Sequence, residues 1–290
     1  MRSVERVVRG AQRVAISLAA IGCCSAVALI ESTAAGSCQW QVLSSRAASS
    51  RDTILEDRLP FLRDPQNPNR VPGPAHLVAV VRTDSLHHPH IFIEDDVRRT
   101  SRLLMPKSAS QPRWSPDGKS LACVAWESQR EPWVLTIVDR AGKRVSQPLR
   151  NFNVMGFSWS PNSKWIAAAG ALAKAPRGIL ALVAVAAQRS QVVDTLQVLA
   201  DYEVAWAPSS ATLVVSRPTA IDSEDEVTAA DLWAFDTHGT KCPLLLTPDF
   251  VESAPHWVNA RRLRYARFRS NDPKRETEDI VVELMPPKAQ

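Results

Sequence analysis

The sequence predicts an all-β fold built from repeats of a four-stranded antiparallel unit, and three observations support this prediction. A Trp-centred segment recurs at intervals of 45 to 51 residues. Each copy is followed by two short runs rich in apolar and β-branched residues, such as Leu121–Trp126 and Trp133–Val138. Polar tight turns such as Asp139–Gly142 separate these runs. The four segments are centred on Trp114, Trp159, Trp206 and Trp257.

This period sets the expected architecture. A repeat of about 40 to 50 residues filled with short strands is typical of a β-propeller blade. We therefore expect about five four-stranded antiparallel blades over residues 75–287, the first without its inner strand and the last without its outer strand. An open sheet edge is prone to aggregation, so we expect an N-terminal patch, Gln39–Leu43 or Ile54–Leu62, to pair into a terminal blade. The alternative is an open arc completed by another chain.

The turn after the first Trp explains the motif physically. In Trp114-Ser115-Pro116-Asp117-Gly118, Pro116 presets φ, Asp117 can bond its own backbone and Gly118 accepts a positive φ. The preceding Trp is suited to fill the gap between twisted blades, so we interpret the motif as structural rather than ligand-binding. The residues assigned this structural role are Trp114, Pro116, Asp117, Gly118, Trp159, Pro161, Trp206, Pro208 and Trp257.

Composition excludes several classes of protein. The chain has 290 residues, of which 45% are apolar and 22% charged, as expected for a folded chain rather than a disordered one. Its net charge is +5, but four arginines lie within the first thirteen residues. The remainder is nearly neutral, whereas nucleic-acid binders are usually strongly basic, so we do not expect nucleic-acid binding.

The N-terminus, residues 1–36, has the three parts of an export signal. An Arg-rich start precedes the apolar run Val14–Ile30, and the small residues Ser32–Gly36 follow. Two alternatives remain: an uncleaved signal anchor, because a run of this length is at the lower limit for spanning a bilayer, and lipid attachment at Cys23, which follows Ala20-Ile21-Gly22. Each alternative places the body outside the cytoplasm, in the periplasm or secreted.

Residues 37–74 are rich in Ser and Pro and predict a flexible arm. After removal of the leader, three cysteines remain, Cys38, Cys123 and Cys242, which allow at most one disulfide. Cys123 lies in an apolar run and is expected to be a core residue. No C-x-x-C pattern is present, so zinc-ribbon and thioredoxin-like chemistry lack their ligands.

At two repeats the residues resemble a known family. Trp114-Ser115-Pro116-Asp117-Gly118-Lys119 and Asp231-Leu232-Trp233-Ala234-Phe235-Asp236 are similar to the WD-type repeats of TolB-like β-propellers. The resemblance implies an extracytoplasmic propeller that binds protein partners. Two departures from TolB are evident: no room exists for a separate N-terminal domain before the propeller, and the chain is too short for six blades.

Motifs for catalysis, cofactors or metals are lacking, so we expect no catalytic residues, no cofactor and no metal. The sequence has no G-x-G-x-x-G, P-loop or H-E-x-x-H. The histidines His87, His88 and His90 form an incomplete ligand set, and the acidic run Asp222–Glu226 lacks calcium-loop spacing. Both are interpreted as solvated loops.

One charged segment is the candidate partner-binding surface. Arginines flank Tyr265 and Phe268 on a strand of the last blade. Such a face commonly keeps a sheet edge soluble, and it is also the best candidate for docking an acidic partner or an anionic lipid surface. These arginines are Arg261, Arg262, Arg264, Arg267 and Arg269.

We therefore expect an exported binding scaffold that mediates protein–protein interaction at the cell envelope. The alternative is a propeller-fold enzyme, a lyase or hydrolase, with a site in the central channel. A third interpretation is a structural subunit that completes a ring with a second chain. Inward-facing His, Asp, Glu and Arg in the channel would favour the enzyme, and small apolar residues would favour binding.

Overall fold

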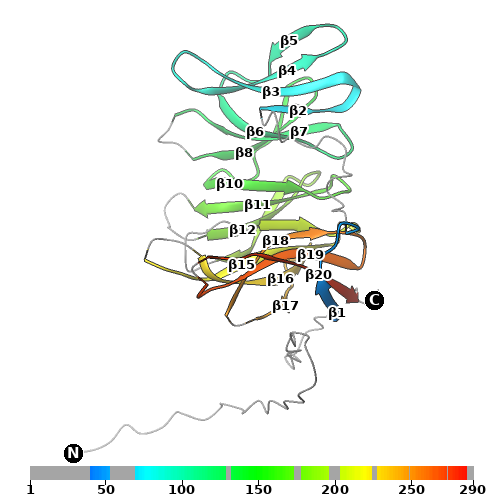
Figure 1. Cartoon of the computed structure of the whole chain (residues 1–290). Helices are drawn as coiled ribbons and strands as arrows, with labels where there is room; N and C mark the ends of the chain where they lie inside the picture. Colours follow the sequence, from blue (N-terminus) through cyan, green and yellow to red (C-terminus); the bar gives the residue numbers. More distant parts are fainter. Residues whose placement is uncertain are drawn as a thin grey trace, which may run out of the picture.

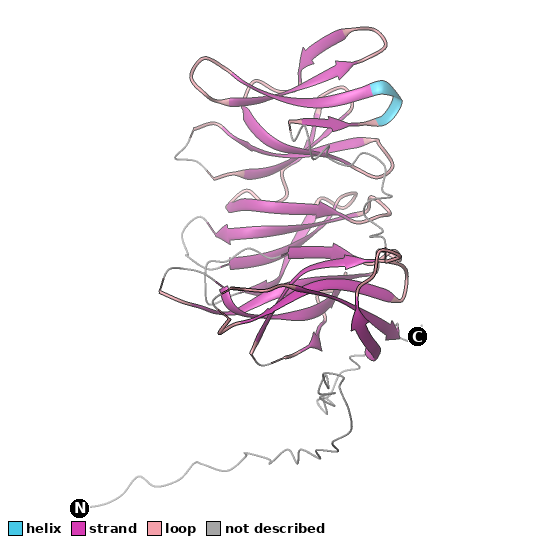
Figure 2. Ribbon diagram, in the orientation of Figure 1, coloured by secondary structure: helices cyan, strands magenta, loops and turns pink. Residues whose placement is uncertain are grey.

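The computed structural model describes residues 40–52, 69–128, 132–172, 178–195, 203–223, 227–247, 249–272 and 274–285. These residues form antiparallel strands with a single 3₁₀ turn, η2 (Pro74–His76) (Figure 2). Within the described ranges, no helix has the length and apolar character needed to span a membrane. The all-β prediction is confirmed.

Three sheets contain four strands each, in which neighbours in sequence pair with each other. The first sheet comprises β2 (Arg70–Pro72), β3 (Leu77–Thr83), β4 (Pro89–Asp95) and β5 (Thr100–Leu103). The second comprises β6 (Ser108–Trp114), β7 (Ser120–Trp126), β8 (Val134–Asp139) and β9 (Arg144–Ser146). The third comprises β10 (Phe152–Trp159), β11 (Trp165–Leu172), β12 (Gly178–Ala184) and β13 (Arg189–Thr195).

The remaining eight strands form one sheet made of two antiparallel halves. One half comprises β14 (Glu203–Trp206), β15 (Thr212–Ile221), β16 (Val227–Asp236) and β17 (Lys241–Leu245). The other comprises β18 (Phe250–Trp257), β19 (Arg262–Arg269), β20 (Glu278–Met285) and β1 (Gln41–Ala47). A single parallel bridge, Ala230 with Val251, joins the halves. We call the three sheets and the two halves the first to fifth units.

The first three units are stacked in chain order, and the fourth and fifth overlap in the view at the other end of the molecule (Figure 1). Four core clusters fill the spaces between consecutive units, and none of them, among the described residues, combines the first unit with the fifth. In Figure 1, the first unit lies at one end of the stack and the fifth, with β1, at the other. The described chain therefore forms an arc whose two end faces do not share a core.

Two short strands complete the terminal units. β1 pairs with β20 as the outer strand of the fifth unit, which confirms the expectation for the patch Gln39–Leu43, described from Trp40 onward. The other candidate patch, Ile54–Leu62, lies outside the described residues. β2 is an inner strand of the first unit that the sequence analysis did not predict. With three residues, including Arg70 and Pro72, it is too short to show an alternating apolar pattern.

The repeated tryptophans lie between the units. Trp114, Trp159, Trp206 and Trp257 are all buried. The indole Nε1 of Trp159 donates to the carbonyl of Arg113 (3.1 Å), that of Trp206 to Ser158 (3.2 Å) and that of Trp257 to Ala205 (3.3 Å). Each acceptor is the residue just before the Trp of the preceding unit. The side chain therefore both fills the gap and bonds the neighbouring inner strand.

The turns after these tryptophans form a second connection between units. Ser163 and Ser210 adopt a left-handed φ of 61°, as Gly118 does at 65°. Their hydroxyls compensate for this strain by accepting hydrogen bonds from the preceding turn: Asp117 N donates to Ser163 Oγ (2.9 Å) and Asn162 N to Ser210 Oγ (3.0 Å).

Candidate functional site

The arginines predicted as a partner-binding strand are divided between two faces of β19. Side chains alternate along a strand, and Arg267 shares a face with Leu263 and Tyr265, which pack against the fourth unit. Arg267 is buried and donates twice to Glu278 Oε2, at 3.1 and 2.9 Å. Arg269 is exposed and lies over the ring of Phe250, 5.0 Å from its centroid.

Arg262 and Arg264 lie on the opposite, outward face of the fifth unit. Arg264 Nη2 bonds Asp279 Oδ2 at 2.5 Å. Arg261 precedes β19 in an exposed turn that Asn259 shapes, because its Oδ1 accepts from the N–H groups of Arg261 (2.8 Å) and Arg262 (2.9 Å). Of the five predicted arginines, the structure therefore brings together Arg261, Arg262 and Arg264.

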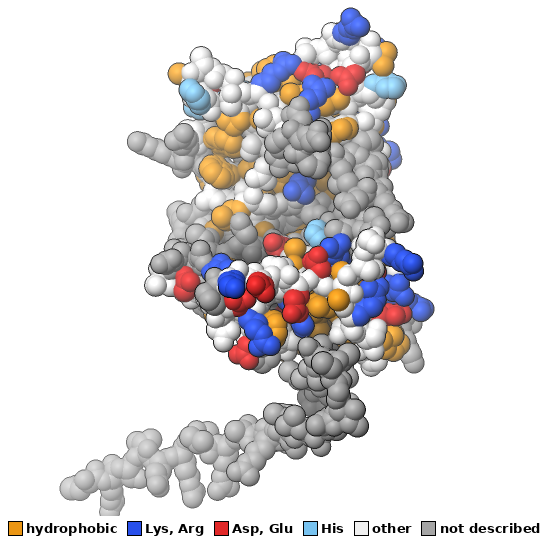
Figure 3. All heavy atoms as spheres, viewed as in Figure 1, with side chains coloured by type: hydrophobic (Ala, Val, Ile, Leu, Met, Phe, Trp, Pro, Cys, Tyr) orange, Lys and Arg blue, Asp and Glu red, His pale blue; other side chains and the backbone are white. Residues whose placement is uncertain are grey.

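A pocket of about 560 Å³ lies where this turn meets the segment after β1. Its three arginines outnumber its single carboxylate, so the lining has two excess positive charges. The pocket is lined by Arg46, Ser49, Arg51, Asp52, Val258, Asn259 and Arg262. Figure 3 shows Lys and Arg side chains, with a few acidic ones, gathered over this part of the fifth unit. We call Arg46, Arg51, Arg261, Arg262 and Arg264 the basic end face.

Asp52 fixes the geometry of the basic end face. It is 3% exposed, and Arg46 binds both of its oxygens at 2.7 Å in a bidentate pair. Ser49 adds bonds from its N–H and hydroxyl, both at 2.9 Å. The hydrogen bonds from Arg46 hold the pKa of the Asp52 carboxyl well below its usual range. Arg46 is thus held in place, whereas Arg51 and Arg262 are exposed.

The sequence analysis missed Arg46 and Arg51 because they lie more than two hundred residues from Arg262 in the chain. Only the pairing of β1 with β20 brings the two segments together. The signal in the sequence was the expected pairing of Gln39–Leu43 into a terminal unit, which would have brought the following residues to the same edge.

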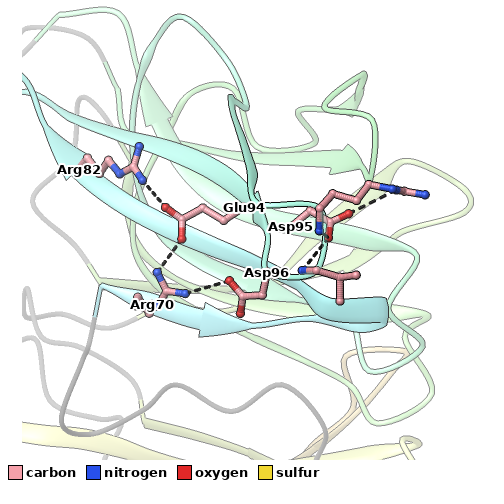
Figure 4. Close-up of polar contacts among 7 residues, drawn as sticks. Arg70, Arg82, Glu94, Asp95 and Asp96 are labelled. Atoms are coloured by element: carbon pink, nitrogen blue, oxygen red, sulfur yellow. Dashed lines mark hydrogen bonds and ion pairs between the residues drawn. The ribbon is translucent and has the colours of Figure 1, made fainter.

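The other end of the arc has a different surface. On the outward face of the first unit, Glu94 binds Arg70 at 2.6 Å and also Arg82, and Arg70 reaches Asp96 at 3.4 Å (Figure 4). Cross-strand pairing places these side chains on the same face as the buried Val78 and Val80. This charge network covers the apolar face, as terminal repeats do in other repeat proteins.

A buried carboxyl that the sequence analysis also missed lies between the fourth and fifth units. Glu252 in β18 is fully buried, and burial together with the nearby Asp231 raises the pKa of its carboxyl to about 9. Thr247 donates its hydroxyl to Oε1, and Oε2 has no hydrogen-bond partner among the described residues. The residue five positions before the repeated Trp is the apolar Ala109 in the second unit and Val154 in the third, but Asp201 in the fourth. A comparison of the repeats in the sequence therefore did not single out Glu252.

The remaining candidates do not form a site. Among the described residues, no group of three or more His, Cys, Asp or Glu is placed to hold a metal. His88 and His90 lie 3.6 and 3.3 Å from Asp84, which also accepts from the backbone of its own turn. Of the acidic run, residues 224–226 lie outside the described residues. The partly or fully exposed inner-strand side chains include Ser108, Ser110, Gln111, Arg113, Asn153, Met155, Ser158, Glu203, Ser253 and His256.

The cysteines follow the sequence prediction where they are described. Cys242 is disulfide-bonded, whereas Cys123 is free and buried in β7. Burial raises the pKa of the Cys123 thiol to about 12, so it stays protonated and unreactive. Cys38 lies outside the described residues.

Comparison with known proteins shows the fold. No family model and no curated protein matches the chain. The β-propeller domain of the Trilobed protease from Pyrococcus furiosus, described as having an open velcro topology, is similar with a TM-score of 0.51 and 13% identity, over 72% of this chain and 67% of that chain. Oligogalacturonate lyase from Vibrio parahaemolyticus has a TM-score of 0.50 and 12% identity over 87% of this chain and 75% of its own.

TolB from Acinetobacter baumannii has a TM-score of 0.48 and 12% identity, over 77% of this chain and 54% of TolB. The chain thus spans about half the length of that protein. At these identities the similarity concerns the fold alone. Together with the four-stranded antiparallel sheets, it identifies the architecture as that of a β-propeller.

Proposed function

We propose that this chain is an exported, TolB-like β-propeller scaffold of five blades that binds an acidic protein partner at the cell envelope through its basic end face. The observation that carries the proposal is the pocket in which Arg46, Arg51 and Arg262 meet with only Asp52 as counter-charge. Both ends of the chain build this surface, since β1 supplies one wall and the turn before β19 the other.

The chemistry of the basic end face suits an acidic partner. Arginine binds carboxylates in a planar, bidentate geometry and is enriched at interface positions of high energy. Asp52 already occupies both Nη groups of Arg46, so Arg51 and Arg262 are the side chains in the pocket that would bind a partner carboxylate. The disulfide at Cys242 supports an oxidising, extracytoplasmic location, in agreement with the predicted export signal.

The alternative, an enzyme with a site in the central channel, has less support. Propeller neighbours include an oligogalacturonate lyase, so the fold is compatible with catalysis. However, the carboxyl with the most displaced pKa, Glu252, is fully buried and has no access to a substrate. The exposed inner-strand side chains of the described residues are mostly serines and other uncharged groups, although Arg113, Glu203 and His256 are among them and favour this alternative.

The test is affinity capture of the full chain from its native envelope fraction after chemical cross-linking, with mass spectrometry of the captured proteins. The double variant Arg51→Gln with Arg262→Gln removes two positive charges from the basic end face. The matched control is the double variant Arg98→Gln with Arg99→Gln, which removes two positive charges from the first unit.

We expect one partner that is captured by the wild type and the control but lost with the double variant, and whose capture weakens as salt is raised because exposed charges are screened. A partner captured equally by all three proteins would contradict the assigned surface. The absence of any reproducible partner would contradict the scaffold function.

A further inference from the structure

The cysteine of β17 forms a disulfide whose partner lies outside the described residues. Cys242 is disulfide-bonded, whereas Cys123, the other cysteine among the described residues, is free and buried in β7. The bond therefore joins β17 to a cysteine of the N-terminal segment. The sequence offers three candidates there, Cys23, Cys24 and Cys38.

The side chain of Cys242 is directed toward the fifth unit. Its neighbour Lys241 bonds Asp194 of the third unit, with 3.0 Å between Nζ and Oδ1, so that face of β17 is turned toward the third unit. Side chains alternate along a strand, and Cys242 and Leu244 therefore share the opposite face. Leu244 belongs to the core cluster between the fourth and fifth units, and Cys242 is 6% exposed. The sulfur atom thus faces the seam between these two units.

β1 brings the N-terminal segment to the same seam. Trp40 and Val42 pack against this core cluster, and the ring centroids of Trp40 and Trp257 lie 5.6 Å apart. Cys38 precedes Trp40 by two residues, and two residues of chain span at most about 7 Å. A disulfide needs a Cα–Cα distance of about 4.4 to 6.8 Å. The covalent chain therefore brings Cys38 to the core that Cys242 faces.

The other two candidates are less suited to reach β17. Cys23 and Cys24 lie within the apolar run Val14–Ile30 of the expected export signal, far from Trp40 in the chain. Cleavage of that signal removes both thiols. An uncleaved anchor would hold both in the bilayer, and lipid attachment would use Cys23 and keep Cys24 at the membrane surface. In each case Cys38 is the thiol that remains for β17.

We propose that Cys38 and Cys242 form a disulfide that fastens the outer strand of the fifth unit, β1, to the outer strand of the fourth, β17. Among the described residues, the backbone of these units is joined by the single parallel bridge of Ala230 with Val251. A cross-link between residues so distant in the chain restricts the unfolded state strongly. The bond therefore holds the end of the arc together, whether or not the basic end face captures a partner.

Formation of this bond requires an oxidant in the exported compartment. Two thiols lose two electrons and two protons, which a disulfide donor of the thiol–disulfide oxidoreductase class accepts as it becomes a dithiol. One cysteine thiolate attacks the disulfide of the donor to form a mixed disulfide, and the second cysteine then displaces the donor thiol. Because Cys242 is buried in the folded chain, we expect the exchange to precede the docking of β1.

Peptide mapping identifies the partner directly. The full chain is isolated from its native envelope fraction without reductant, and free thiols are alkylated in denaturant before digestion with trypsin. Cleavage after lysine and arginine places Cys242 in the peptide 242–261. We expect this peptide to be linked to the peptide that ends at Arg46, with fragmentation assigning the bond to Cys38, and Cys123 to be alkylated. The protein should run as a monomer in non-reducing electrophoresis.

The proposal is overturned if Cys242 is bonded to Cys23 or Cys24, if the bond joins two copies of the chain, or if Cys242 is alkylated as a free thiol. Each of these results is read from the wild type, so none depends on whether a variant folds.

Thermal melting of Cys38→Ser, with and without a dithiol reductant, tests the stabilising role. Without reductant, the variant should melt roughly 5 to 15 °C below the wild type, and hydrogen exchange should be faster in residues 41–47 but unchanged in residues 77–83. With reductant the two proteins should melt alike, because neither then has the bond. The neighbouring substitution Ser37→Ala is the control and should match the wild type in both conditions.

Equal melting of Cys38→Ser and wild type without reductant would overturn the stabilising role. A difference of the same size in both conditions would also overturn it, because the effect would then come from the serine rather than from the bond.

Discussion

At the scale of single residues, the repeats provide internal comparisons that explain what each side chain does. Glu252 occupies a place where the second unit has the buried Ala109 and the third has the buried Val154. The opposite residue in the paired strand is Arg267, where the corresponding residues are Ala125 and Gly170. At this position the fifth unit therefore has a polar pair where the second and third units have an apolar contact. A buried titratable group of this kind makes folding stability depend on pH.

The first prediction concerns that dependence. The pKa of Glu252 is raised to about 9 in the folded protein, above its ordinary value of 4.5. Between these values the folded state holds a proton that the unfolded state has lost, so its contribution to stability is full below pH 4.5 and is lost as pH rises toward 9. In Glu252→Gln the side chain is neutral at every pH, so this loss of folding stability does not occur. The stability of the variant relative to the wild type should therefore increase as pH rises from 5 to 8, by up to about 1.4 kcal/mol per pH unit.

Urea denaturation at several pH values measures this difference. The exposed Glu276→Gln is the matched control and should track the wild type. A stability difference between Glu252→Gln and wild type that stays constant with pH would show that Glu252 is ionised in the folded protein.

Two glycines in one hairpin give a second residue-scale prediction. A Cβ at Gly170 would lie 1.9 Å from the carbonyl oxygen of Asn153, whereas a Cβ at Gly156 meets nothing within 4 Å. Gly170→Ala must therefore displace backbone and should cost roughly 1 to 3 kcal/mol or more. Gly156→Ala should be close to neutral. Equal unfolding midpoints for the two variants would contradict the close packing of β10 and β11.

At the scale of elements, strands and turns are positioned by bonds between neighbouring units. The sequence predicted the inner strands of the second to fifth units because each ends in the repeated Trp. It did not predict β2, which is only three residues long, or the full extent of β1, whose side chains are mostly polar and exposed. Short and polar strands are specified by pairing with an existing edge rather than by their own pattern.

The turn-to-turn bonds lead to a prediction with two substitutions at one site. Ser163→Ala loses the hydrogen bond to Asp117 N and keeps the left-handed φ, so it should lose about 0.5 to 1.5 kcal/mol. Ser163→Gly loses the same bond, but glycine adopts this φ without strain. The Gly variant should therefore be the more stable of the two in chemical denaturation. The opposite order would contradict the strained conformation.

The role of β1 gives a further prediction at this scale. Residues 37–290 and residues 53–290 are compared under reducing conditions, so that the disulfide at Cys242 does not contribute. Without β1, the edge of β20 and part of the core around Trp40 and Val42 are exposed. The shorter chain should melt at a markedly lower temperature and aggregate more readily. Identical melting curves would mean that β1 does not complete the fifth unit.

At the scale of the whole molecule, the arc ends in two different faces. The first unit ends in paired charges around Glu94, whereas the fifth ends in the arginine-rich pocket. The repeat period was sufficient to predict the stacked four-stranded units. The basic end face was only partly predictable, because strand alternation buries Arg267 and because chain pairing adds Arg46 and Arg51. The first effect could have been read from residues 261–269, because Arg267 shares the alternation of Leu263 and Tyr265. The second could not, since Arg46 and Arg51 are distant in the chain.

Hydrogen–deuterium exchange of the full chain, with and without the solubilised envelope fraction, tests the central claim most directly. If a partner binds the basic end face, exchange should slow in residues 44–52 and 258–264 and remain unchanged in the first unit. Protection confined to the first unit or to the inner strands, or no protection at all, would contradict the account of a scaffold that binds through its basic end face.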